Sequence, residues 1–257
     1  MTRPVLRAAG AAAVLAAAAL PAAFAAGGGN GLSLSPPLIE QPAKVGAIGS
    51  FKVANATGQP LRISVSARPW RQSADGSVAP DQRRTLPEIH LGASSFTLAD
   101  GASQDVSLAL TAVPGTGSVY GSYDVIAAPT QAPARHSAVT VEFRLVGSLR
   151  LDPVAPQLAA AASKVVVSGT RSHGELFLAV RNTGNTIQPI GGSVRVSGRS
   201  PALSSVLKPV AILPGATVNL AALGLHGSLP AGSYTLAATL RAGGKTLKQV
   251  RLHFTLR

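Results

Sequence analysis

The chain has 257 residues and no cysteine, and its 23 Lys and Arg against 10 Asp and Glu give a formal net charge of +13. The absence of cysteine excludes disulfides and a lipid-modified N-terminal Cys, so each domain must be stabilised by its hydrophobic core alone. The length is sufficient for two domains of ordinary size.

The first 25 residues have the features of a secretory signal peptide rather than of a folded segment. Basic residues precede an apolar stretch over 8–20, and small residues occupy positions −3 and −1 of a cleavage site after Ala25. The apolar stretch is shorter than the ~20 residues that span a bilayer, which disfavours the alternative of a retained membrane anchor. We therefore expect a periplasmic or secreted chain that has no transmembrane segment after cleavage of residues 1–25.

Residues 26–152 alternate apolar and polar side chains between turns rich in Gly and Pro, which is the period of strands with one buried face. The opening strand contains two prolines, which restrict it to a sheet edge or a strand start. Phe51 and Val53 are expected on the buried face of the second strand. The expected strands of this first domain are 32–39, 50–54, 61–66, 95–98, 105–110, 123–127 and 138–146.

A linker over 153–160 is expected to precede a second domain over 161–257, which is strongly basic. The Ala-rich segment 157–163 is the one helix that the sequence favours. The closely and regularly spaced turns favour an all-β fold of two tandem immunoglobulin-like β-sandwich domains over a parallel α/β fold. The expected strands of the second domain are 164–168, 175–180, 192–196, 216–220, 234–240 and 247–254.

Three turn signatures occur once in each domain and in the same order, which indicates two duplicated modules. Each begins with an Asn-containing turn that ends in Thr-Gly, continues with a second Gly turn, and ends with Gly-Ser-Tyr. Asn and Gly tolerate the positive φ of tight turns, and the tyrosine matches the tyrosine corner of sandwich domains, whose hydroxyl bonds to nearby backbone. The signatures lie at 55–58, 98–101 and 121–123, and again at 182–184, 213–215 and 232–234.

No enzyme motif is complete, and we expect no enzyme, no cofactor and no metal site. None of the five histidines has another His or a Cys at metal-ligand spacing. Ser205 and Lys208 fit Ser-x-x-Lys without its companion motifs, and the Gly-Gly-Lys-Thr at 243–246 lacks a phosphate-loop glycine. Glu175 is the only acidic residue of the second domain, which leaves no carboxylate pair there. A catalytic triad assembled from distant residues is a third alternative, after the two functions given below.

The basic charge is concentrated in one domain. Residues 26–153 contain 10 Lys and Arg against 9 Asp and Glu, whereas residues 154–257 contain 11 against one. Such a field favours an anionic partner, such as an envelope polymer, lipid headgroups or an acidic protein, and a role in solubility alone is the alternative. Nucleic acid is not expected, because the basic strands offer few aromatic side chains for base stacking. The candidate contacts for an anionic partner are Arg144, Arg150, Arg195, Arg199 and Lys208.

Several segments of the first domain together resemble the N-terminal domain of PapD-like periplasmic chaperones, which assemble pili. The resemblance covers the first domain and the layout of two sandwiches. The similar segments are Leu-Ser-Leu-Ser-Pro at 32–36, the strand–turn–strand at 51–63, Asp-Gly at 75–76, and the segments 96–106, 123–125 and 139–153.

This resemblance implies that the last strand of the first domain is donated to a pilus subunit that lacks a strand. The apolar residues that alternate along this strand, Val139, Val141, Phe143 and Leu145, would then fill the subunit's groove. The alternative is that they face the core of their own domain.

The resemblance also implies a basic pair that binds the subunit's C-terminal carboxylate. The corresponding positions here are Leu38 and Ser148, neither of which is basic. Arg144 or Arg150 could take this role only in a shifted register.

Two functions follow from these observations. The first is a periplasmic chaperone-like protein that binds pilus or surface-structure subunits by β-strand addition. The second is a non-enzymatic cell-surface or envelope-binding module that uses its basic C-terminal domain.

Overall fold

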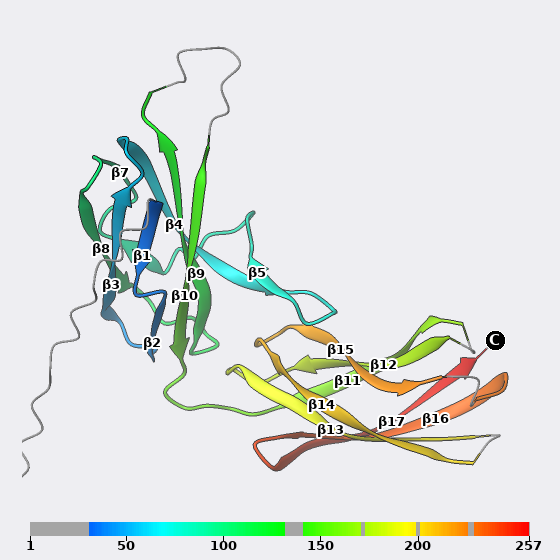
Figure 1. The fold of residues 1–257 in the computed structure, drawn as a ribbon. Helices are drawn as coiled ribbons and strands as arrows, with labels where there is room; N and C mark the ends of the chain where they lie inside the picture. Colours follow the sequence, from blue (N-terminus) through cyan, green and yellow to red (C-terminus); the bar gives the residue numbers. More distant parts are fainter. Residues whose placement is uncertain (1–30, 132–140, 171–172, 199–200, 226–228, 257) are drawn as a thin grey trace, which may run out of the picture. The chain divides into compact units, whose positions relative to one another are not determined.

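The computed structural model describes residues 31–131, 141–170, 173–198, 201–225 and 229–256. The predicted signal peptide lies outside these residues. Within the described ranges every regular element is a strand, and most strand pairs are antiparallel, which confirms the predicted all-β fold of two sandwiches (Figure 1). None of the described residues forms a helix long and apolar enough to span a membrane.

The first sandwich packs two sheets. One has the strand order β1-β3-β8-β6, and the other has the order β2-β10-β9-β4-β5, with β7 also paired to β4. Its strands are β1 (Gly31–Ser35), β2 (Leu38–Pro42), β3 (Gly46–Ala56), β4 (Leu61–Gln72), β5 (Val78–Pro80), β6 (Ile89–Leu91), β7 (Ser95–Leu98), β8 (Ser103–Leu110), β9 (Val119–Pro129) and β10 (Phe143–Asp152).

The second sandwich packs a sheet of order β11-β12-β15 on a sheet of order β14-β13-β16-β17. Its strands are β11 (Ala160–Gly169), β12 (Gly174–Asn182), β13 (Gln188–Ser197), β14 (Leu203–Ile212), β15 (Thr217–Gly224), β16 (Gly232–Ala242) and β17 (Lys245–Leu256).

The predicted opening strand over 32–39 is two strands in the structure. β1 pairs with β3 in one sheet, whereas β2 pairs with β10 in the other, and the chain changes sheets at Pro36 and Pro37. Both strands lie at a sheet edge, as the prolines predicted. This change of sheet places β2 beside the last strand of the domain.

The predicted helix over 157–163 is wrong, because β11 begins at Ala160, which pairs with Asn182, and continues antiparallel to β12 as far as Gly174. A seven-residue alanine-rich segment is too short to form a helix by propensity, and the ladder with β12 satisfies its backbone instead. Three strands were missed: β5, β6 and β14. The first two have only three residues each, and β14 contains Pro209.

Each sandwich has its own hydrophobic core. In the first, Phe51 and Val53 are fully buried as predicted, and the Phe51 ring stacks on Tyr123 with 4.4 Å between centroids. In the second, the largest fully buried side chains are leucine and isoleucine, such as Leu178 and Ile190. The two cores contain no cysteine, so hydrophobic burial is the main stabilising term in both sandwiches.

The first two turn signatures of each domain contact each other through a buried asparagine. The amide of Asn55 donates to Leu98 O at 3.0 Å, and Gly101 N donates to Asn55 O at 2.8 Å. In the second sandwich Asn182 donates to Ile212 O at 2.7 Å, and Gly215 N donates to Asn182 O at 2.9 Å. The first two signatures therefore form the same structural unit in both sandwiches, a buried asparagine that hydrogen-bonds one turn to the next; we call this unit the asparagine joint.

The third signature has a different role in each sandwich. Tyr234 forms the predicted tyrosine corner, since its hydroxyl donates to Pro230 O at 2.8 Å, four residues before it. The same prediction for Tyr123 is wrong, because its hydroxyl donates to Pro36 O, where the chain passes from β1 to β2. Tyr123 lies inside β9 rather than at a strand start, and this places its ring between the two sheets.

Candidate functional site

The strand β10 has one neighbour along its first half and two along its second. It pairs with β9 from Phe143 to Leu151, whereas its pairing with the parallel strand β2 starts only at Ser148, which is in register with Leu38. Figure 1 shows β2 as a short strand beside one end of the long β10. Among the described residues, the segment Phe143–Gly147 therefore has one edge without a paired strand.

Backbone groups point out of this open edge. Ser148 N donates to Pro37 O at 2.7 Å, so the backbone of Ser148 faces the β2 side. Successive residues of a strand direct their N–H and C=O groups to opposite sides, so Arg144 and Val146 face the same side as Ser148. Beyond the end of β2 these two residues present N–H and C=O groups that an added strand could bond.

The side chains of β10 change in burial at the same point. Leu149 and Leu151 are fully buried, whereas Phe143 and Leu145 are half-buried and pack against the edge of the first core. Gly147 lies between the two halves of the strand. Only glycine fits at this position, because a methyl group there would lie 2.1 Å from ring carbons of Tyr123. The first half of β10 is thus both unpaired on one side and incompletely covered.

The structure brings two of the four predicted donor residues together. Phe143 and Leu145 lie on the inner side of β10, which is the side that the alternative interpretation, their own core, also requires. Val141 lies just before the strand, with 52% of its surface exposed, and Val139 lies outside the described residues.

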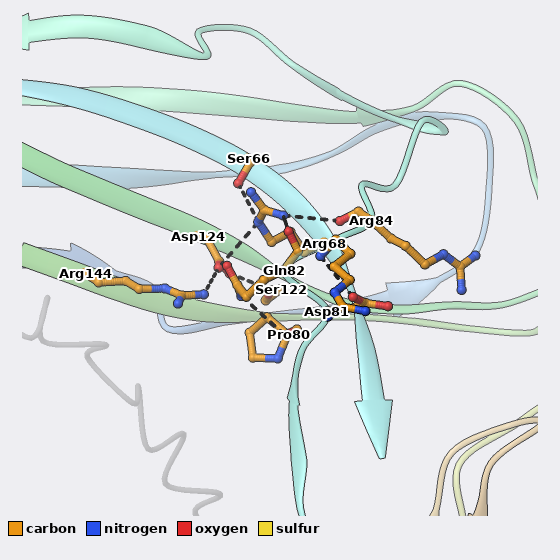
Figure 2. A network of polar contacts seen from close by, with 10 residues as sticks. Ser66, Arg68, Pro80, Asp81, Gln82, Arg84, Ser122, Asp124 and Arg144 are labelled. Atoms are coloured by element: carbon orange, nitrogen blue, oxygen red, sulfur yellow. Dashed lines mark hydrogen bonds and ion pairs between the residues drawn. The ribbon is translucent and has the colours of Figure 1, made fainter. Parts of the chain in front are cut away.

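A charged network on the outer face holds this part of β10 (Figure 2). Asp124 of β9 is fully buried and accepts a hydrogen bond from the guanidinium of Arg144 on β10. Arg68 of β4 reaches the same carboxylate from the other side at 3.8 Å, and Ser122 Oγ donates to it at 2.6 Å. The network links β4, β9 and β10, and Arg68 also donates to Gln82 O at 2.8 Å.

The predicted anchor positions are direct neighbours, because the register pairs Leu38 with Ser148. Neither is basic, and the nearest basic residue on β10, Arg150, is already paired. Its guanidinium lies 3.3 Å from Glu40 and 3.1 Å from Asp152. The predicted anchor position therefore contains the hydroxyl of Ser148 and the apolar side chain of Leu38. The neighbouring guanidinium of Arg150 is already paired with two carboxylates.

The remaining candidate residues lie in the second sandwich. Arg195 on β13 and Lys208 on β14 are exposed, and Arg199 lies outside the described residues. These residues therefore contribute neither to the Asp124 network, which contains Arg144, nor to the ion pairs of Arg150.

Sequence reasoning did not identify Asp124, Arg68 or Tyr123 as parts of this site. Alternation along β9 places Asp124 on the outer face, where an acidic residue is ordinary. Its burial results from the register that sets Ser66 of β4 and Val146 of β10 beside it, and from the arginines that cover it. No signal in the sequence shows that register.

No protein-family model and no curated protein matches the chain. Solved structures that are similar include a chain of the chaperone–tip adhesin complex of CFA/I fimbriae, at 12% identity over 88% of this chain and 98% of that one, with a TM-score of 0.49. The YadV chaperone is 14% identical over 86% of this chain and 99% of its own, with a TM-score of 0.43. A chain of the Salmonella enterica complex of SafA pilin with the SafB chaperone is 15% identical over 88% and 96%, with a TM-score of 0.43. These matches are PapD-like fimbrial chaperone structures at low sequence identity.

Proposed function

We propose that this chain is a periplasmic chaperone-like protein that binds pilus or surface-structure subunits by β-strand addition to β10. The open edge of Phe143–Gly147 is the observation on which the proposal rests. An extended segment of a partner could continue the sheet there, as β2 does for the second half of the strand.

The half-buried side chains of β10 also support binding of a partner at the open edge. Phe143 and Leu145 are covered on one side by their own core and leave apolar surface at the edge. A subunit that lacks a strand has an exposed apolar groove, and burying both surfaces is favourable by roughly 25 cal/mol per Å². The two interpretations of these residues are therefore compatible, since each side chain can contact its own core and a partner.

The Asp124 network would reduce the cost of binding. The first half of β10 has one paired neighbour, and the ion pair of Arg144 with Asp124 adds a second attachment to the sheet. A donor strand that is held extended before the partner arrives loses less conformational entropy on binding.

Because neither Leu38 nor Ser148 is basic, we propose that this chain binds its subunit without a basic anchor for the C-terminal carboxylate. Arg150 could take that role only by leaving Glu40 and Asp152. We infer that backbone pairing and apolar contacts at the edge supply most of the affinity.

The proposal is tested by removing one backbone donor from the open edge. Val146→Pro deletes an N–H that faces away from β9, so the β9 ladder keeps its bonds. The matched control is Val146→Thr, because the Val146 side chain is 41% exposed and either change removes it. The exported chain is purified from its own cells, and the co-purifying subunits are identified and quantified by mass spectrometry.

We expect Val146→Pro to lose most of the captured subunit and Val146→Thr to retain it, with both variants folded by circular dichroism. If the proline variant captures as much subunit as the threonine variant, the edge is not the binding site.

A further inference from the structure

The outer face of the sheet β14-β13-β16-β17 in the second sandwich forms a trough with basic sides. Arg195 of β13 is in register with Ser204 of β14 and Ala237 of β16, and Ala237 is in register with Arg251 of β17. The two arginines are thus two strands apart, about 10 Å, with a small side chain between them. We call this surface, formed by Ser193, Arg195, Ser204, Ala237, Thr239 and Arg251, the basic trough.

The trough is hollowed along the two central strands. A hollow of about 740 Å³ is lined by the six residues of the basic trough and by further residues of the same four strands, Val206 and Gln249 among them. A second hollow of about 330 Å³ continues past Thr235 and His253, and a third of about 340 Å³ continues past Arg241. From Thr235 to Arg241 the strand covers roughly 20 Å, so the surface suits an extended chain better than a single small ion.

The basic side chains of this face have no acidic neighbours. The four strands contain no Asp or Glu, and Glu175, the only acidic residue of 154–257, lies on β12 in the other sheet. The ion pairs found among the described residues all belong to the first sandwich. Arg195 and Arg251 are therefore available to bind anionic groups from solution.

The polar groups of the trough are side chains rather than backbone. Its central strands are paired on both sides, so their N–H and C=O groups are already used in the sheet. The hydroxyl residues lie around the arginines: Ser204 is in register with Arg195 on the side away from Arg251, and Ser193 and Thr239 pair with each other in the next row of the same face. Guanidinium groups bind carboxylates and phosphates in a bidentate manner, and hydroxyls bind other hydroxyls.

Aromatic side chains are almost absent from the lining of the large hollow. Tyr234 and Phe254 are directed to the inner side, where their rings stack with 5.6 Å between centroids. Both residues also line the second hollow, but the large hollow that contains Arg195 and Arg251 has no aromatic residue in its lining and offers no platform for bases there, which disfavours a nucleic acid. Within the large hollow the central strands β13 and β16 are paired on both sides, so an extended peptide could add a strand only at the outer edges of β14 and β17 and not in the trough itself.

We propose that the basic trough binds an extended anionic polysaccharide. Arg195 and Arg251 would bind acidic groups on neighbouring sugars, and the hydroxyls of Ser204, Ser193 and Thr239 beside them would bind sugar hydroxyls. This inference goes beyond subunit capture and is independent of it, because the trough lies in the second sandwich and the open edge of β10 lies in the first.

The test measures binding of the full exported chain to a fluorescent oligogalacturonate by anisotropy at fixed ionic strength. The probes for comparison are a neutral dextran of equal length and a poly-glutamate of equal charge. The trough variant is Arg195→Gln with Arg251→Gln. The matched control is Lys164→Gln with Arg181→Gln, which removes the same charge from exposed positions on β11 and β12 of the other sheet.

We expect the trough variant to weaken oligogalacturonate binding at least tenfold, the control variant less than twofold, and dextran not to bind. A second variant, Ala237→Glu, places a carboxylate between the two arginines and should weaken binding as strongly. Subunit capture through β10 should not change in any of these variants.

Three results would overturn the inference. Equal losses in the trough and control variants would show that net charge alone attracts the polymer. Equally tight binding of poly-glutamate through the same arginines would assign the trough to an acidic protein segment. Absence of oligogalacturonate binding at low salt would remove the polysaccharide altogether.

Discussion

The two sandwiches contain the same three turn signatures, and comparing them shows which contacts are common to both domains and which are specific to one. The asparagine joint is the same in both, since Asn55 and Asn182 each tie one turn to the next by buried hydrogen bonds. The tyrosines differ, since Tyr123 bonds to the junction of β1 and β2 whereas Tyr234 forms a local corner. A repeated motif therefore predicts a repeated role only where its contacts are made within the motif.

The residue after each tyrosine shows the same divergence. In the first sandwich it is Asp124, which lies between two arginines on the outer face. In the second it is Thr235, whose hydroxyl lies 3.0 Å from His253 Nδ1 on the neighbouring strand. The same position thus holds a carboxylate that pairs with arginines in the first sandwich and an uncharged hydroxyl in the second.

The largest effect is expected from breaking the shared joint. Asn182→Ala leaves two buried carbonyls without a donor, and Asn55→Ala leaves one buried and two part-buried carbonyls without a donor; each should lower the free energy of unfolding by about 3 kcal/mol. Urea denaturation followed by circular dichroism measures this change. If only one variant is destabilised, the two joints are not equivalent; Asn219→Ala on β15 is the control, with an expected change below about 0.5 kcal/mol.

A smaller effect is expected from removing the acidic residue that distinguishes the first sandwich. Asp124→Asn leaves two guanidiniums without their carboxylate and should cost about 2 kcal/mol. Amide hydrogen exchange should increase most at the start of β10, because that half of the strand has one paired neighbour. An increase in exchange spread evenly over the sheet would show that the ion pair of Arg144 with Asp124 does not stabilise the start of β10.

The two tyrosines should differ when each loses its hydroxyl. Tyr123→Phe removes a donor from Pro36 O at the point where the chain changes sheets, and we expect a loss of about 1.5 kcal/mol. Tyr234→Phe breaks a local bond to Pro230 O and should cost about 1 kcal/mol or less. Thermal denaturation of both variants ranks them, and the reverse order would contradict the long-range role of Tyr123.

The smallest effect is a dependence of stability on alkaline pH. Burial raises the pKa of Tyr123 to about 12, against about 10 in an unfolded chain. Between these values the unfolded chain loses the proton first, so the stabilisation is complete below pH 10 and decreases as the pH rises toward 12. Burial also raises the pKa of Tyr120, so the comparison of wild type with Tyr123→Phe isolates the contribution of Tyr123.

Urea denaturation at pH 9, 10 and 11 measures this dependence. The wild type should lose more stability over the series than Tyr123→Phe. Equal slopes for the two proteins would show that the Tyr123 hydroxyl is not buried as described.

Much of the fold could be predicted from local pattern. Alternation placed Phe51 and Val53 in the core, and the Asn and Gly signatures marked the turns, because both depend on residues close in sequence. The helix over 157–163 failed since its strand form depends on pairing with β12. The candidate site was predictable only in part: the sequence indicated the strand that contains Phe143 and Leu145, but not where its edge opens.

The sequence by itself determined the two-module all-β layout, the turn chemistry and the concentration of basic charge in the second module, because composition and period 2 are local properties of the chain. The tertiary structure decided that β2 ends at the middle of β10, that Asp124 lies buried between Arg68 and Arg144, and that Arg195 and Arg251 face one hollow. These features depend on strand order and register, which join residues far apart in the chain.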